Sequence, residues 1–202
     1  MNFEFSEEQQ MLREQARGFL TEHCSTSVVR AVLDSNEDWD AGLWKKVADM
    51  GWTATVIPEA YGGLGLSYYE LAILAEEMGR SAAPLPFSSS LYLASEAIRH
   101  FGNESQKSEW LPKLASGECV ATVAMAERAG RLVLDQLQTR RTDSQITGHK
   151  VPVADASVAD VAVVLARSDQ GLEACLVPLK QEGVVISPVL TFDASRGRSA
   201  VT

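Results

Sequence analysis

The sequence is poor in the residues that build disulfides and metal sites. Its three cysteines are Cys24, Cys119 and Cys175, and its three histidines are His23, His100 and His149. The odd number and wide scatter of the cysteines favour free thiols in a reducing cytoplasm over a disulfide framework. Neither residue type has the spacing typical of metal ligands, so we expect no metal site.

No apolar stretch is long enough to span a bilayer, so we expect no membrane span. The acidic N-terminus lacks the basic start and apolar middle of a signal peptide, and we therefore predict a cytoplasmic protein. Lysine and arginine number 18 against 27 aspartate and glutamate residues, which gives a net charge of -9. This excess of negative charge argues against a nucleic-acid partner.

The first part of the chain has the pattern of amphipathic helices. Apolar residues recur at intervals of three and four, which predicts helices over residues 6–23, 40–50, 67–80, 88–101 and 103–116. Ser67 and Glu70 have the spacing of a capping box that opens the third of these helices. Helical spacing also places Met50 and Phe101 on the inward faces of their helices.

The second part of the chain has the pattern of a sheet. Short apolar runs that favour β-structure cover residues 119–125, 161–166, 174–179 and 184–190. No helical pattern lies between them, which indicates an antiparallel, barrel-like arrangement. We therefore predict an α+β multidomain protein, with an all-α helical bundle over residues 1–117 and an antiparallel β-barrel-like domain over residues 118–202.

A glycine-rich connection, Gly51–Gly65, links two of the predicted helices. It reads Gly-Trp-Thr-Ala-Thr-Val-Ile-Pro-Glu-Ala-Tyr-Gly-Gly-Leu-Gly. By its spacing alone it favours a structural turn over a phosphate cradle, because it is neither a P-loop nor a dinucleotide fingerprint. As a string it resembles the acyl-CoA dehydrogenase family, in which Gly-Trp, Pro-Glu and Tyr-Gly-Gly-x-Gly recur in this order. The run Trp110–Glu118 resembles the junction between the helical and sheet domains of that family.

The resemblance extends more weakly to a first flavin loop of the family, at residues 123–130. Ala126-Glu127-Arg128 stands where the family has Thr-Glu-Pro. The threonine hydroxyl of the family bonds the flavin, and Ala126 has no hydroxyl. The resemblance therefore leaves the main chain of Met125 and Ala126 as the expected cofactor contacts. The structural alternative for this segment is an ordinary strand and turn.

A second flavin loop of the family corresponds to residues 148–160. The positions that match the family pattern are Gly148, Lys150, Ala159 and Asp160. Pro152 replaces the aromatic residue that packs on the flavin, and Ala154 replaces the hydroxyl residue that bonds it. The expected contacts here are therefore the main-chain groups of Val153 and Ala154. As an alternative, Pro152 simply terminates a strand.

The resemblance implies a reaction, a cofactor and partners. The reaction is α,β-desaturation of an acyl-CoA thioester, in which a carboxylate removes the α proton and a hydride passes to FAD. The helix over residues 88–101 and the loop Gly51–Gly65 would shape the acyl pocket. The family's glutamate base lies in a C-terminal helical domain that this sequence does not contain, so we assign no catalytic residue here. An electron-transfer flavoprotein is the implied electron acceptor, and a homo- or hetero-oligomer is the implied assembly.

Three alternatives to an active dehydrogenase remain open at this point. The losses at Ala126, Pro152 and Ala154 favour a non-catalytic or half-site partner subunit of a heteromeric acyl-CoA dehydrogenase. A plain helical interaction module and other flavin chemistry on the same fold are also compatible with the sequence. We further expect the apolar run 161–166 to form a bare sheet face, which would make the chain an oligomer or part of a longer one.

Overall fold

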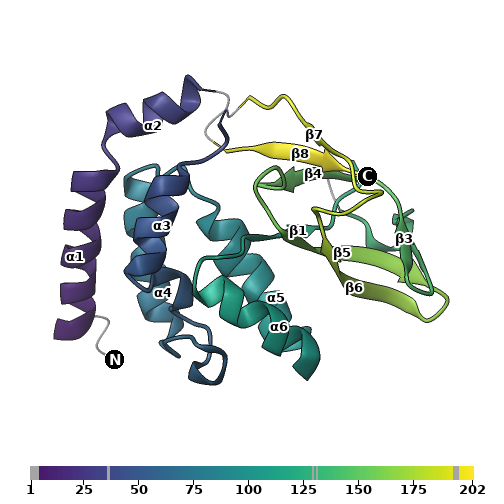
Figure 1. Cartoon of the computed structure of the whole chain (residues 1–202), viewed down its shortest axis with the longest axis horizontal. Coiled ribbons are helices and arrows are strands. Elements are labelled where there is room, and N and C mark those ends of the chain that lie inside the picture. The colour runs from purple at the N-terminus through teal and green to yellow at the C-terminus, as the bar shows by residue number, and fades with distance from the viewer. Residues whose placement is uncertain (1–4, 36, 129, 131, 193–195) are drawn as a thin grey trace.

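The helices form where the capping and spacing signals place them, as the computed structural model shows (Figure 1). The structure describes residues 5–35, 37–128, 130, 132–192 and 196–202. Its α-helices are α1 (Glu7–His23), α2 (Thr26–Leu33), α3 (Ala41–Asp49), α4 (Tyr68–Arg80), α5 (Glu96–Phe101) and α6 (Glu104–Ala115). Shorter helical pieces are η1 (Trp52–Ala54), η2 (Glu59–Tyr61), η3 (Ser88–Ser95) and η4 (Leu134–Gln136). None of these described helices is long and apolar enough to cross a membrane.

Capping boxes fix the start of three helices. Ser6, Ser67 and Asn103 each accept a main-chain hydrogen bond from their own helix, and the residue three positions later bonds back to the cap. These reciprocal bonds satisfy N–H groups that a helix start otherwise leaves free. The predicted box at Ser67 is therefore confirmed.

The predicted helix over residues 88–101 differs from a regular α-helix. Its first part, η3, is a π-helix, and only its last turns form α5. Leu91, Ala94 and Ile98 are buried as their spacing predicts, but Phe101 is the last residue of α5 and lies outside both buried clusters. The prediction that Phe101 points inward is wrong, because its side chain is 85% exposed, and Met50 at the end of α3 is also exposed.

The strands form two sheets beside the helices. They are β1 (Ala121–Ala124), β2 (Arg140–Thr142), β3 (Gln145–Thr147), β4 (Lys150–Ala154), β5 (Val161–Ser168), β6 (Gly171–Pro178), β7 (Ile186–Pro188) and β8 (Arg198–Val201). One sheet has the order β1-β5-β2-β3 with β6 also on β5, and the other has the order β4-β8-β7. Strand β4 continues through Pro152, so this proline does not terminate it.

The order of a helical domain followed by a sheet domain is confirmed, but the sheets differ from the expected antiparallel barrel in two details. Strand β1 pairs with β5 in parallel, with Ala121 opposite Val161, and β2 also meets β5 in parallel. Among the described strands the two sheets do not close into a barrel. The chain returns through β2, β3 and β4 before it reaches β5, and it therefore enters β5 in the same direction as β1. The boundary near Gly117 stays a prediction.

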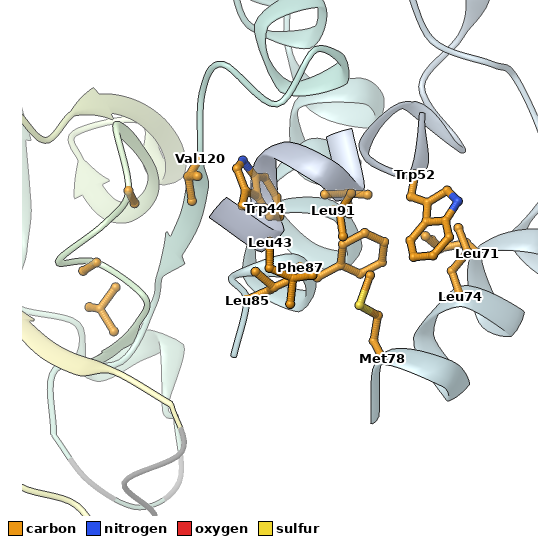
Figure 2. Close-up of a cluster of buried hydrophobic side chains, with 14 of the residues drawn as sticks. Leu43, Trp44, Trp52, Leu71, Leu74, Met78, Leu85, Phe87, Leu91 and Val120 are labelled. Carbon is orange, nitrogen blue, oxygen red and sulfur yellow. The ribbon is translucent and has the colours of Figure 1, made fainter. Parts of the chain in front are cut away.

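Strand β5 is the centre of the sheet and is covered on both faces. Ala162 and Val164 belong to a buried cluster that includes residues of the second sheet and of the N-terminal helices. Val161 and Val163 belong to a second cluster with α5 and α6. Figure 2 shows the first cluster reaching from the helices to Val120. The expectation of a bare face over residues 161–166 is therefore wrong, because other parts of this chain bury nearly all of that run.

The glycine-rich connection folds back on itself between α3 and α4. Gly51 has a φ of 75°, a conformation that glycine adopts without a Cβ penalty and that commonly ends a helix. The N–H of Leu64 donates to the carbonyl of Ala54, and the N–H of Leu66 donates to that of Thr55. Gly63 lies so close to Ile57 that an added Cβ would be 1.8 Å from its carbonyl oxygen. The loop is thus compact and tolerates no side chain at Gly63.

We expect the substitution Gly63→Ala to lower the free energy of unfolding by at least about 2 kcal/mol, because the methyl group forces the loop away from Ile57. Urea denaturation followed by tryptophan fluorescence measures this change. The control is Gly18→Ala in α1, where an added Cβ meets nothing within 4 Å. That control should raise stability by about 0.5–1 kcal/mol, and equal effects of the two substitutions would contradict the close approach.

Candidate functional site

The two segments predicted to contact a flavin lie side by side at the end of β1. The main-chain N–H of Val151 donates to the carbonyl of Ala126 over 2.8 Å. The Nζ of Lys150 donates to the carbonyl of Met125 over 3.1 Å, although these residues are 25 positions apart in the sequence. The fold therefore assembles one candidate site from the two loops.

The four residues predicted to contact the cofactor differ in their solvent exposure. Met125 is 39% exposed, and Ala126 and Ala154 are half-buried. Val153 is fully buried, and it pairs with Ser199 of β8. The side chain of Val153 therefore belongs to the core, and only its main chain remains for a cofactor. The assignment of these four residues to a cofactor stays a prediction.

A buried ion pair between Glu127 and Lys150 holds the two segments together. The carboxylate of Glu127 lies 3.1 Å from Nζ of Lys150, and their side chains are 14% and 3% exposed. Glu127 also accepts hydrogen bonds from the N–H of Gln138 over 2.6 Å and from the N–H of Thr139 over 2.7 Å. The Thr139 hydroxyl donates a further bond to the same carboxylate. One side chain thus links the end of β1 to the starts of β2 and β4.

The hydrogen bonds keep Glu127 ionised. Burial raises the pKa of Glu127, but the donors from Thr139, Gln138 and Lys150 outweigh it and lower the pKa to about 2. Burial lowers the pKa of Lys150, and its bond to Glu127 acts in the opposite direction. A general base works best with a pKa near the operating pH. Glu127 is therefore a positioning residue and not a candidate base.

A hollow of about 450 Å³ opens beside this network. Ala126, Glu127 and Arg128 line one side of it, and the loop that includes Val133 and Gln138 lines the other. The hollow lies at the predicted flavin loop, and its lining is a mixture of apolar and charged groups.

The residues present do not supply the side-chain contacts to a flavin that the resemblance implies. Ala126 and Ala154 have no hydroxyl, and Pro152 has neither an aromatic ring nor a main-chain N–H. The carbonyl of Ala154 already accepts the hydroxyl of Thr122 over 2.6 Å, and the carbonyls of Met125 and Ala126 are occupied as described above. The Glu127–Lys150 network is in place, but the side-chain groups that would bond the flavin edge are missing and three main-chain carbonyls are engaged.

A second buried network joins β4 to the π-helix. Asp155 accepts hydrogen bonds from the Ser89 hydroxyl over 2.6 Å and from the Arg196 guanidinium over 2.7 Å. The same guanidinium nitrogen donates to the Ser88 hydroxyl over 2.8 Å. Neither this network nor the role of Glu127 is predicted from the sequence. The sequence features that could have indicated them are a run of serines in an apolar helix and charged residues beside apolar strands.

A family model described as acyl-CoA dehydrogenase, N-terminal domain, matches residues 6–118, which is more than half of the chain. The chain belongs to the acyl-CoA dehydrogenase family. The mitochondrial isovaleryl-CoA dehydrogenase of Pongo abelii is 32% identical over 206 residues, which cover 95% of this chain and 48% of the relative. This chain thus spans about half the length of the curated relatives it matches.

Solved structures of acyl-CoA dehydrogenase relatives share the fold described above. A chain of the ChsE4-ChsE5 complex from Mycobacterium tuberculosis matches with a TM-score of 0.88 and 26% identity, over 100% of this chain and 55% of that one. The acyl-CoA dehydrogenase complexed with FAD from Bacillus anthracis matches with a TM-score of 0.86 and 25% identity, over 98% of this chain and 35% of that one. The helical layer and the two sheets are therefore an arrangement that members of the family share.

The Glu127 network makes a prediction about pH. The pKa of Glu127 is lowered from 4.5 to about 2 on folding, so its stabilising contribution is present above about pH 4.5 and is lost as the pH falls towards 2. We expect Glu127→Gln to lower the melting temperature at pH 6. The difference in melting temperature from the unsubstituted protein should shrink as the pH falls from 4.5 to 2. Circular dichroism melts measure this, with the exposed Glu118→Gln as control. A constant difference across this pH range would contradict the network.

Proposed function

We propose that this chain forms the helical domain and part of the middle domain of a flavoprotein that desaturates an acyl-CoA thioester between its α and β carbons. Membership of the acyl-CoA dehydrogenase family and the fold shared with FAD-complexed and heteromeric relatives support this proposal. When bound, FAD would supply the acceptor for the hydride that leaves the β carbon. No residue of this chain is assigned to removal of the α proton.

The observation that carries the proposal is the Glu127–Lys150 network. It costs free energy to bury two charges, and a pair of this kind persists where its geometry is well satisfied. Here it fixes the main chain of Met125, Ala126 and the start of β4 at one edge of the sheet. We propose that a flavin lies against this edge, near the main chain of Met125, Ala126, Val153 and Ala154. The carbonyls of Met125, Ala126 and Ala154 are engaged, so the contacts would come from other main-chain groups. The helix η3 and the loop Gly51–Gly65 would line the acyl group.

A second function is favoured by the missing hydroxyl and aromatic groups at Ala126, Pro152 and Ala154. In this alternative the chain is a non-catalytic or half-site subunit that supports an active partner. The relative in the ChsE4-ChsE5 complex is part of an assembly of two named proteins, which makes a heteromeric assembly a reasonable proposal here. An electron-transfer flavoprotein as electron acceptor and a cytoplasmic location also remain proposals.

Acyl-CoA binding tests the shared part of both functions. We expect calorimetry to show saturable binding of butyryl-CoA or isovaleryl-CoA to the protein, and at least about tenfold weaker binding of CoA without an acyl group. Absence of binding by all acyl-CoA compounds would leave the interaction-module alternative. A visible flavin spectrum and reduction of a dye by acyl-CoA support the enzyme, whereas a colourless protein that takes up no added FAD supports the partner subunit.

Restoring a hydroxyl tests the proposed cofactor contacts. We expect Ala126→Thr and Ala154→Ser each to strengthen FAD binding by about threefold to tenfold, since one hydrogen bond contributes about 0.5–1.5 kcal/mol. Quenching of FAD fluorescence on titration measures the affinity. The control is Ala60→Thr in the glycine-rich connection, which lies outside the candidate site. An affinity that neither site substitution changes would argue that the flavin does not lie against these segments.

A further inference from the structure

Strand β6 forms an open edge of its sheet (Figure 1). It pairs with β5 along its whole length, ending at Ser168 opposite Gly171, and with no other strand among those that the structure describes. The register is continuous, without a bulge. An edge strand presents a row of unpaired main-chain groups that a further strand can bond, and short or bulged strands are a usual protection against this. Strand β6 has 8 residues and lacks that protection.

The hydrogen-bond pattern shows which groups of β6 point outward. In an antiparallel pair, residues alternate between bonding to the partner strand and facing away from it. Just beyond β6, the N–H of Leu179 donates to the carbonyl of Asp160, so every second residue back from Leu179 bonds to β5. The residues between them, Leu172, Ala174 and Leu176, therefore direct their N–H and C=O groups away from β5.

The side chains at these three outward positions are apolar. Leu172 is 43% exposed, Ala174 is exposed and Leu176 is half-buried. The charged side chain of the strand, Glu173, lies on the other face because successive side chains alternate, and it is paired with Arg141 over 2.5 Å. The outward positions thus carry neither a charge nor a proline, which are the residues that commonly block a sheet edge.

A small apolar groove borders the outward positions. It lies between β6 and the end of α5, and its lining includes Phe101, Ala174 and Leu176. Its volume is about 50 Å³, whereas ligand sites occupy roughly 300–1,000 Å³, so the groove suits part of a side chain. Phe101 is 85% exposed beside it. An exposed apolar surface of this kind favours contact with another protein chain.

The edge of β6 is complementary to the same edge of a second copy. When two copies pair antiparallel about a two-fold axis at Ala174, Leu172 of each copy lies opposite Leu176 of the other. The two Ala174 residues then face each other, and all three outward positions exchange hydrogen bonds. Leu176 lines the groove, so Leu172 of the second copy comes next to that groove and to Phe101.

Other two-fold registers are less favourable. An axis at Glu173 places two carboxylates directly opposite each other, which destabilises the pair. An axis at Cys175 places Leu172 opposite Pro178, which has no N–H to donate. The axis at Ala174 instead places Glu173 opposite the uncharged Cys175. The charges and the proline of the strand therefore select one register.

We propose that β6 is a self-association edge, at which two copies of this chain join their sheets by antiparallel pairing of residues 172–176 about a two-fold axis at Ala174. The same surface patch serves both copies, as in other two-fold interfaces. The proposal does not depend on the acyl-CoA function, because it is tested without a ligand.

The test is analytical ultracentrifugation from micromolar to millimolar protein, combined with amide hydrogen exchange. We expect a reversible equilibrium between monomer and dimer, and slower exchange at Leu172, Ala174 and Leu176 as the dimer forms. A monomer at every concentration would overturn the proposal and leave the edge to a different partner. A dimer without slower exchange at these amides, or slow exchange already in the monomer, would overturn it as well.

Substitutions at Ala174 separate edge pairing from the fold of the monomer. Ala174→Pro removes an N–H that bonds nothing within the chain, a change that edge strands tolerate, and it should weaken the dimer at least about tenfold, since one hydrogen bond per copy is lost. The control Ala174→Val keeps the N–H and should keep the dimer. If Ala174→Pro does not fold, Ala174→Lys places like charges at the axis and should weaken the dimer about fivefold, with Ala174→Gln as its neutral control. Unchanged dimerisation in a folded Ala174→Pro or Ala174→Lys variant would contradict the proposal.

Cross-linking tests the register. With Cys175→Ser as background, Ala174→Cys should give a disulfide-linked dimer on mild oxidation, because residues directly opposite in a bonded pair have Cα atoms about 5.5 Å apart. In the same background Leu172→Cys should not, because its two copies would be about 14 Å apart along the strands. Cross-linking of Leu172→Cys, or none of Ala174→Cys, would overturn the axis at Ala174.

Discussion

The Glu127–Lys150 ion pair is the interaction on which the candidate site depends. Two buried charges are stable together only when donors and acceptors around them are satisfied, and here Thr139, Gln138 and the carbonyl of Met125 complete the set. Because these groups come from the ends of β1, β2 and β4, the pair fixes three chain segments at once. The position of the predicted flavin edge follows from that constraint.

At this site the ion pair is present, whereas neighbouring side chains differ from the family pattern. Glu127 and Lys150 stand at positions that match the family pattern, but Ala126, Pro152 and Ala154 do not carry the expected hydroxyl or aromatic groups. Positioning the main chain and bonding a ligand are separate requirements. The ion pair meets the first, and hydroxyl or aromatic side chains meet the second. A chain can therefore retain the fold of an acyl-CoA dehydrogenase while its own contribution to cofactor binding changes.

The junction between the helices and the sheet rests on buried polar contacts. The π-helix presents Ser89 to Asp155, and the hydroxyl of Ser90 accepts a bond from the N–H of Ala121 in β1. Ser89, Ser90 and Asp155 are buried there, and the side chain of each has a hydrogen-bond partner, which is the condition for placing such groups in a core.

Local patterns in the sequence determined the helices, their caps and the family resemblance, because hydrogen bonds within a helix and the spacing of apolar residues act over a few positions. Strands such as Arg140–Thr142, all exposed and polar, carried no such signal. Only the tertiary structure decided that β5 is covered on both faces, that Phe101 at the end of α5 is exposed, and that Glu127 meets Lys150. Each of these outcomes depends on contacts between residues far apart in the chain, whose free energy no local pattern records.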